Sequence, residues 1–143
     1  MLQQMAEGLG LSGVVEEFPA RVGYLEALHH VLAADGLIVL GVDDPAYMPS
    51  KLFTYVLARK PMLACLHARS QANRYFEQCP DLGYVLHFED GTSGVRQSGD
   101  PEMEAFLQAA SAGFEKDRSA EIAGFLSPNA ARRHADLFEA CLK

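Results

Sequence analysis

The sequence predicts an α/β protein in which a parallel sheet carries helices on both faces. Two apolar runs, residues 36–42 and 61–67, have the continuous aliphatic composition of strands that are buried on both sides. The segments between strand candidates show the 3.6-residue spacing of amphipathic helices. Strands that alternate with single helices pair in parallel through right-handed crossovers, so a doubly wound sheet is the expected result.

The expected elements follow in a regular order along the first ninety residues. Four segments have strand character: residues 13–18, 36–42, 61–67 and 83–88. Four segments have helical spacing of their apolar residues: 2–11, 24–34, 49–60 and 70–78. Helix and strand therefore alternate from the N-terminus to residue 88.

The last third of the chain is expected to be helical. Asp100 is a good N-cap before Pro101, and an apolar repeat follows at Met103, Phe106, Leu107 and Ala110. Ser127 similarly begins a helix whose apolar stripe is His134, Leu137, Phe138 and Cys141. We therefore expect one domain over residues 1–143, in which residues 100–143 form a helical tail packed against the sheet.

Composition sets limits on the function. With 143 residues, of which 49% are hydrophobic, the chain can bury a core of its own. Its net charge of -7, without a basic stripe, argues against binding to nucleic acid. No apolar run approaches the ~18 residues that a transmembrane helix needs. Cys65, Cys79 and Cys141 are widely spaced, which is typical of reduced thiols in a cytoplasmic protein.

The loop over residues 43–50 is the strongest functional candidate. It follows a predicted strand, at the end of the sheet where open parallel sheets bind ligands, and it is longer than the roughly two to six residues usual for a strand-to-helix connection. In the helix that follows, the apolar side chains of Leu52, Phe53, Val56 and Leu57 are expected on the core side. The opposite side would then carry Ser50, Lys51, Thr54 and Tyr55.

Such a helix start suits an anion. Its unpaired N–H groups and positive dipole end would face a phosphate together with the ammonium group of Lys51. The alternative is structural, because Pro49 and Ser50 are common at helix starts and Lys51 could be a solvated charge. Spacing alone leaves both interpretations open.

Three histidines are further candidate ligands. His67 ends the strand over 61–67 on the ligand side of the sheet, so it could reach the same crevice as Lys51 or be an ordinary loop residue. Adjacent His29 and His30 would point about 100° apart on a helix, which makes a poor metal pair, so no metal site is expected. Glu16, Glu17 and residues 88–90 are interpreted as solvated strand ends.

No motif for a common cofactor is present. The sequence contains neither a G-x-G-x-x-G fingerprint nor a Walker lysine loop, so no cofactor is expected. It also lacks a G-x-S-x-G elbow, and Ser50 has no visible base, so the catalytic residues stay unknown.

The stretch DDPAYMPSKLFTYVLARKPMLA resembles the C-terminal domains of glycosyltransferases with the two-domain GT-B architecture. In these enzymes a strand ends in a loop followed by proline and a serine-lysine pair or an equivalent. The likeness includes Ala34-Asp35 before the strand, covers residues 15–72, and extends to the closing helix after Ser127. It implies a Rossmann-like sheet that is one half of a GT-B fold.

The resemblance also implies roles for individual residues. In that family the helix start binds the diphosphate of a sugar nucleotide, which falls here on Ser50 and Lys51. An acidic residue usually binds the ribose, and its position is Thr54, while the first acid of the same motif is replaced by Ala46. Arg59 stands where the family has glycine. The remaining binding candidates are Tyr55, Tyr47, Asp43 and His67.

The predicted function is therefore a glycosyltransferase domain that binds a nucleotide-diphosphate sugar and acts when joined to an acceptor domain. A GT-B enzyme needs two such domains, so this chain is not expected to catalyse transfer alone. The alternative is a non-catalytic module that binds a nucleotide or a partner protein. An N-terminal acceptor domain, or another copy of the chain at an open sheet edge, is a possible partner.

Overall fold

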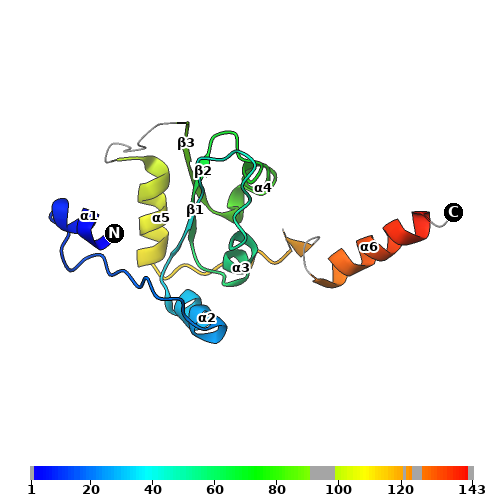
Figure 1. Ribbon diagram of the computed structural model, residues 1–143, viewed down its shortest axis with the longest axis horizontal. Coiled ribbons are helices and arrows are strands. Elements are labelled where there is room, and N and C mark those ends of the chain that lie inside the picture. The colour runs from blue at the N-terminus through cyan, green and yellow to red at the C-terminus, as the bar shows by residue number, and fades with distance from the viewer. Residues whose placement is uncertain (1, 91–98, 121, 124–126, 142–143) are drawn as a thin grey trace. The chain divides into compact units, whose positions relative to one another are not determined.

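The structure, a computed structural model, describes residues 2–90, 99–120, 122–123 and 127–141 (Figure 1). The chain divides into two compact units, Met1–His30 and Val31–Lys143. In the second unit, strands β1 (Leu37–Leu40), β2 (Met62–His67) and β3 (Tyr84–Phe88) form a parallel sheet in the order β1-β2-β3. The predicted α/β class with a parallel sheet is confirmed, with three of the four expected strands.

Helices flank this sheet on both faces, as predicted. Helix α3 (Leu52–Leu57) connects β1 to β2, and helix α4 (Asn73–Gln78) with the short 3-10 helix η1 (Pro80–Leu82) connects β2 to β3. Helix α5 (Pro101–Ser111) follows β3, and Figure 1 shows it on the side of the sheet opposite α3 and α4. The predicted cap is present, since the carboxylate of Asp100 accepts from the N–H of Glu102.

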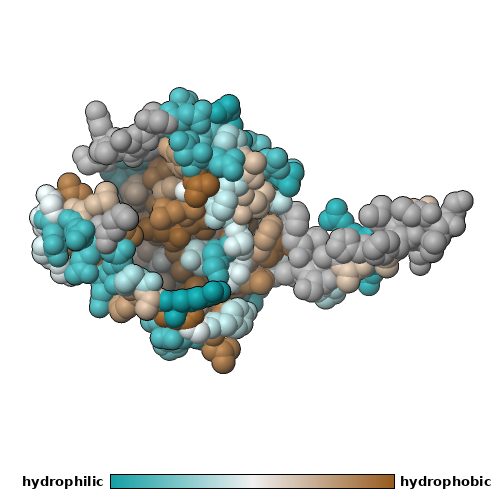
Figure 2. Space-filling view, viewed as in Figure 1, coloured by the Kyte–Doolittle hydropathy of each residue, from teal (hydrophilic) through white to brown (hydrophobic). Residues whose placement is uncertain are grey.

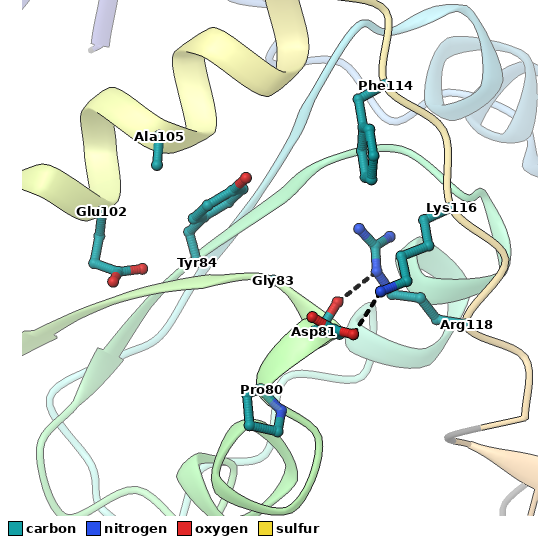
Figure 3. Close-up of a pocket in the computed structure, with 9 residues that line it drawn as sticks. All are labelled: Pro80, Asp81, Gly83, Tyr84, Glu102, Ala105, Phe114, Lys116 and Arg118. Atoms are coloured by element: carbon teal, nitrogen blue, oxygen red, sulfur yellow. Dashed lines mark hydrogen bonds and ion pairs between the residues drawn. The ribbon is translucent and has the colours of Figure 1, made fainter.

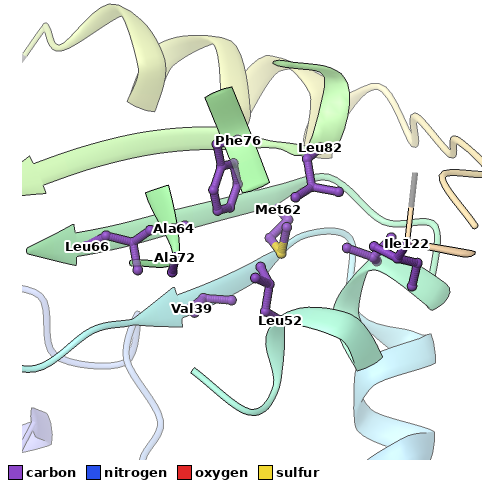
Figure 4. Close-up of a cluster of buried hydrophobic side chains, with 10 residues drawn as sticks. Val39, Leu52, Met62, Ala64, Leu66, Ala72, Phe76, Leu82 and Ile122 are labelled. Carbon is purple, nitrogen blue, oxygen red and sulfur yellow. The ribbon is translucent and has the colours of Figure 1, made fainter. Parts of the chain in front are cut away.

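The larger part of the core lies between the sheet and the helices α3 and α4. Alternate strand residues point to this face because successive side chains in a strand alternate. The cluster comprises Val39, Leu52, Val56, Met62, Ala64, Leu66, Ala72, Phe76, Leu82 and Ile122 (Figure 4). Full burial of each large aliphatic side chain contributes about 1.5–3 kcal/mol, so this face accounts for much of the stability.

The second face is covered only in part. Leu63 of β2 and Leu86 of β3 pack against Phe106 of α5. Over the neighbouring strand β1 the same face stays open, because Ile38 is 51% exposed and Leu40 is 63% exposed. Figure 2 shows apolar residues gathered over this part of the molecule.

The expected strand over residues 13–18 is wrong. The first unit contains helix α1 (Leu2–Gly8), and helix α2 (Tyr24–Ala33) begins in it, but the residues between them are not a strand. A strand needs a neighbour for its N–H and C=O groups, and the described sheet contains only β1, β2 and β3. The apolar side chains of this segment are exposed accordingly, Val14 by 75% and Phe18 by 70%.

Two helices bury less of their apolar stripes than predicted. Helix α3 was expected over residues 49–60, but it spans six residues and leaves Leu57 49% exposed. In α5 the stripe residue Leu107 is 53% exposed. On β3, His87 is exposed, and its Nε2 lies 3.2 Å from Oδ1 of Asn73.

Helix α3 ends in a left-handed residue. Arg59 has a φ of 62°, a conformation that glycine adopts at little cost and other residues rarely use. The position is the one at which the glycosyltransferase family has glycine. Its N–H donates to the carbonyl of Val56, and its carbonyl accepts from Lys116, so contacts on both sides hold the strained residue.

A non-helical segment after α5, here called the strap (residues 113–120), crosses the start of β2 and β3. Arg118 is buried and donates to the carbonyls of Asp81 and Lys60. Three ion pairs line up beside it: Arg59–Asp117, Lys60–Glu115 and Lys116–Asp81. The strap therefore joins the C-terminal third of the chain to the end of the sheet at which β2 and β3 begin, opposite the predicted ligand site.

The carboxyl groups of the strap contacts are acidified by their partners. A hydrogen bond from Lys116 lowers the pKa of Asp81, and one from Lys60 lowers the pKa of Glu115. The pKa of Asp117 is lowered first by hydrogen bonds from Ser119 and then by the charge of Arg59.

The predicted helical tail is present as α5 and as α6 (Ser127–Cys141). Helix α5 packs on β3 and β2. The described side chains of α6 are mostly exposed, and its expected stripe of His134, Leu137, Phe138 and Cys141 lies outside the described side chains. Within the residues that the structure describes, no helix is both long and apolar enough to cross a membrane.

Candidate functional site

Polar side chains at or just after the ends of all three strands meet at the carboxyl end of the sheet. Asp43 follows β1, His67 is the last residue of β2, and Asp90 follows β3. Nε2 of His67 lies 2.8 Å from Oδ1 of Asp90 and 4.0 Å from Oδ1 of Asp43. With Arg69, which pairs with the second oxygen of Asp90, these residues are named the strand-end cluster. His67, Arg69 and Asp90 line part of a cavity of about 180 Å³.

His67 is the organising residue of the strand-end cluster. Its side chain is only 2% exposed, and Nδ1 accepts the backbone N–H of Arg69 at 3.0 Å. Because that nitrogen is an acceptor, the neutral ring carries its hydrogen on Nε2 and donates it to Asp90. Both ring nitrogens are therefore satisfied, as a buried polar group requires.

Asp90 is the most strongly held carboxylate of the cluster. The hydrogen bond from His67 lowers the pKa of this exposed side chain, and the positive charge of Arg69 lowers it further. Asp90 is thus kept ionised at neutral pH. Asp43, which is 61% exposed, presents a second carboxylate beside it.

The same residues have the composition of a metal site. One donor atom each from Asp43, His67 and Asp90 lies within 4.8 Å of the others, a grouping that sequence analysis did not anticipate. A metal-ligating histidine normally donates its other ring N–H to an oxygen. Here that nitrogen accepts from Arg69, and Nε2–H is committed to Asp90. The pattern favours a hydrogen-bonded cluster over a metal centre.

The loop over residues 43–50 is fixed to this edge by hydrogen bonds. The carboxylate of Asp44 accepts from the N–H of Ala46, and the carbonyl of Asp44 accepts from Tyr47. The hydroxyl of Ser70 donates to the carbonyl of Tyr47 at 3.4 Å. Loop 43–50 and the turn after β2 thus support each other.

Ser50 and Lys51 are exposed where α3 begins. Lys51 has helical backbone angles and its side chain makes no cap hydrogen bond, while the N–H of Leu52 donates to the carbonyl of Pro49. The helix is only six residues long, and its dipole is correspondingly small. The positive charge at this position comes mainly from the ammonium group of Lys51.

Thr54 and Tyr55 lie further along the same helix and are half-buried. Tyr55 packs against the core cluster, so its ring is held by the protein. Among the seven predicted binding residues, Asp43 and His67 lie directly beside each other. Tyr47 joins them through loop 43–50, where its side chain is 39% exposed.

Sequence reasoning missed Arg69 and Asp90. Residues 88–90 were interpreted as a solvated strand end, and the side chain of Asp90 is indeed 63% exposed, but its carboxylate contacts two other strand-end residues. The available signal was position, because Asp90 follows a predicted strand at the same edge as His67.

A second cavity, of about 290 Å³, lies at the opposite end of the sheet, where β3 begins (Figure 3). It is lined by Pro80, Asp81, Gly83, Tyr84, Glu102, Ala105, Phe114, Lys116 and Arg118. Two of its charged groups, Asp81 and Lys116, already pair with each other, and Arg118 holds the backbone. These charged groups therefore hold the strap against the sheet, and we do not assign a ligand to this cavity.

No protein-family model, no curated protein and no solved structure matches this chain. The glycosyltransferase resemblance therefore stays a prediction from the sequence motifs between residues 15 and 72 and in the last helix.

Proposed function

We propose that this chain is the donor-binding domain of a glycosyltransferase, a Rossmann-like half of a GT-B fold that holds a nucleotide-diphosphate sugar. Transfer of the sugar then depends on an acceptor domain, which completes the active site from the other side of the cleft. Support comes from the parallel α/β sheet, the motif around Ser50 and Lys51, and the left-handed Arg59 at the family's glycine position.

The observation that carries the proposal is the strand-end cluster. Two carboxylates and one arginine lie where open parallel sheets bind nucleotides, beyond the carboxyl ends of the strands. The lysine of the neighbouring helix start is exposed. A ligand with one anionic part and several hydroxyl groups matches this combination of charges.

Each part of the donor has a candidate partner. Lys51 and the first-turn N–H groups of α3 bind the diphosphate, and Ser50 adds a hydrogen bond. Asp43 and Asp90 accept hydrogen bonds from sugar or ribose hydroxyls, which compensates for the missing family acids at Ala46 and Thr54. Tyr47, Thr54 and Tyr55 border the ribose or the base.

The chemical contribution of the domain is electrostatic. As the glycosidic bond to the diphosphate breaks, negative charge grows on the departing nucleotide. The ammonium group of Lys51 stabilises this charge more in the transition state than in the ground state, which lowers the barrier. The acceptor and any general base come from outside this chain.

Isothermal titration of the full chain with UDP, GDP and their sugar conjugates tests the proposal. We expect micromolar binding of at least one diphosphate, with a loss of tenfold or more on Lys51→Ala. The matched control is Lys60→Ala, because Lys60 carries the same charge but pairs with Glu115 at the other edge of the sheet. Its affinity for the nucleotide should equal that of the unmodified chain.

The result also separates this function from its alternative. If Lys51→Ala bound a nucleotide with the same affinity as the unmodified chain, the binding site would not include the start of α3. No heat with any nucleotide or nucleotide sugar would favour a module that binds a partner protein. The absence of acids at Ala46 and Thr54 is the observation that keeps this alternative in view.

A further inference from the structure

Strand β1 is an edge strand of the described sheet. In the described sheet it has β2 on one side and no strand on the other. Residues 36–42 contain no charged residue and no proline, the usual devices that prevent a sheet edge from adding another strand. The edge is therefore chemically suited to accept one.

The backbone groups of two residues face outward along this edge. The N–H groups of Leu37 and Gly41 donate to carbonyls of Pro61 and Cys65, so the odd-numbered residues of β1 bond to β2. Ile38 and Leu40 lie between them in the parallel ladder, and their N–H and C=O groups point away from β2. A further strand would find donors and acceptors at these two positions.

Apolar side chains accompany these backbone groups. Ile38 is 51% exposed and Leu40 is 63% exposed, both on the face that α5 leaves open, and Val42 beyond them is 46% exposed. Alternate residues of an added strand would pack beside Ile38 and Leu40.

Charge decides what kind of strand fits. Asp35 lies before β1, and Asp43 and Asp44 lie after it, all of them exposed. If two copies paired through β1 about a two-fold axis, the two strands would be antiparallel. Only the register centred on Val39 would then give hydrogen-bond partners to the outward N–H and C=O groups of both Ile38 and Leu40. That register places Asp35 of one copy opposite Asp43 of the other, twice over, and like charges directly opposite are destabilising. A second copy is therefore a poor occupant.

We propose that the edge of β1 is a docking site for an extended segment of another protein. The segment has alternating apolar residues and a lysine or arginine at each end. Its basic ends lie against Asp35 and Asp43, its backbone bonds to Ile38 and Leu40, and its apolar side chains cover the open face. This is β-strand addition. It shares Asp43 with the proposed donor site but requires no bound nucleotide.

A nine-residue peptide, Lys-Val-Thr-Val-Thr-Val-Thr-Val-Lys, spans the distance from Asp35 to Asp43 and tests the site. Fluorescence anisotropy of the labelled peptide with the full chain should show saturable binding. The same peptide with glutamate at both ends should bind at least tenfold more weakly, and raising the salt concentration should reduce the difference.

Two variants locate the peptide. Leu40→Pro removes an outward N–H and leaves the β1–β2 bonds in place, since proline is tolerated on the open side of an edge strand. It should lose binding by tenfold or more. Leu57→Lys, at an exposed apolar position on α3, should bind like the unmodified chain. Circular dichroism checks that both variants fold.

Hydrogen exchange supplies a measurement that needs no variant. The peptide should slow exchange of the amides of Ile38 and Leu40 and leave those of α4 unchanged. The proposal is overturned if the two peptides bind equally, if neither binds, or if exchange at β1 does not change. It is also overturned if sedimentation shows a dimer of the chain that Leu40→Pro dissociates, because the occupant is then a second copy.

Discussion

His67 donates from Nε2 to Asp90 across 2.8 Å, which ties the last residue of β2 to the segment that follows β3. The same ring accepts the N–H of Arg69, which fixes the turn after β2. One buried side chain thus positions two neighbouring parts of the candidate site. Its contribution to structure can be measured separately from any ligand.

We expect His67→Ala to lower the free energy of unfolding by about 2 kcal/mol, because it leaves a small cavity and a backbone N–H without its acceptor. Urea denaturation followed by circular dichroism measures the change. Asp90→Ala is the comparison, and its effect should be smaller because this carboxylate is exposed. Equal midpoints for His67→Ala and the unmodified chain would contradict the assigned role.

The ion pairs of the strap predict a dependence of stability on pH. Asp81, Glu115 and Asp117 have lowered pKa values in the folded chain, so the unfolded chain binds their protons more tightly. Their contribution is therefore complete above the unfolded pKa values of about 4 and is lost as the pH falls through the folded values. The urea midpoint should fall between about pH 5 and pH 3.

A variant with Asp81→Asn, Glu115→Gln and Asp117→Asn serves as the control for this pH effect. It should be less stable than the unmodified chain at pH 7, and its midpoint should change less on acidification. An identical pH profile for the two proteins would assign the acid sensitivity to other carboxyl groups, such as Asp90.

The sequence predicted the parts of this fold that local patterns determine. The apolar runs that became β1 and β2 were recognised as strands from their continuous hydrophobicity, but only β2 is buried on both faces, because Ile38 and Leu40 of β1 are exposed. The segment at residues 13–18 also has strand character in its sequence, but a strand requires a neighbour, which local sequence does not reveal. The strand predicted at residues 13–18 is absent, and β1 is left as an edge strand, because local sequence does not show which segments pair.

The candidate site was predicted in part for a related reason. The position of His67 at a strand end was enough to place it at the ligand edge. Asp90 and Arg69 act through contacts between strands, and nothing in their immediate sequence indicates those contacts. The strap was missed because it has no periodicity, although its buried Arg118 joins elements more than thirty residues away.

Arg59 offers a test of the strain at the end of α3. Arg59→Gly should be more stable than Arg59→Ala by about 1 kcal/mol, because only glycine adopts a φ of 62° without cost. Both variants lose the exposed ion pair with Asp117, so the comparison isolates the backbone. Thermal or urea denaturation measures it, and an alanine variant at least as stable as the glycine variant would show that the residue is not strained.

Gly83 lies where β3 begins, and the space around it predicts the effect of adding a methyl group. A Cβ at this position would lie 2.6 Å from the carbonyl oxygen of Met62, a backbone atom at the start of β2. Gly83→Ala should therefore lower the free energy of unfolding by roughly 1–3 kcal/mol, since one strand must shift. Gly23→Ala, where no atom lies within 4 Å of the new group, should change it by less than about 0.5 kcal/mol. Urea denaturation of both variants measures the difference, and an equal effect would mean that β2 and β3 approach each other less closely than the structure shows.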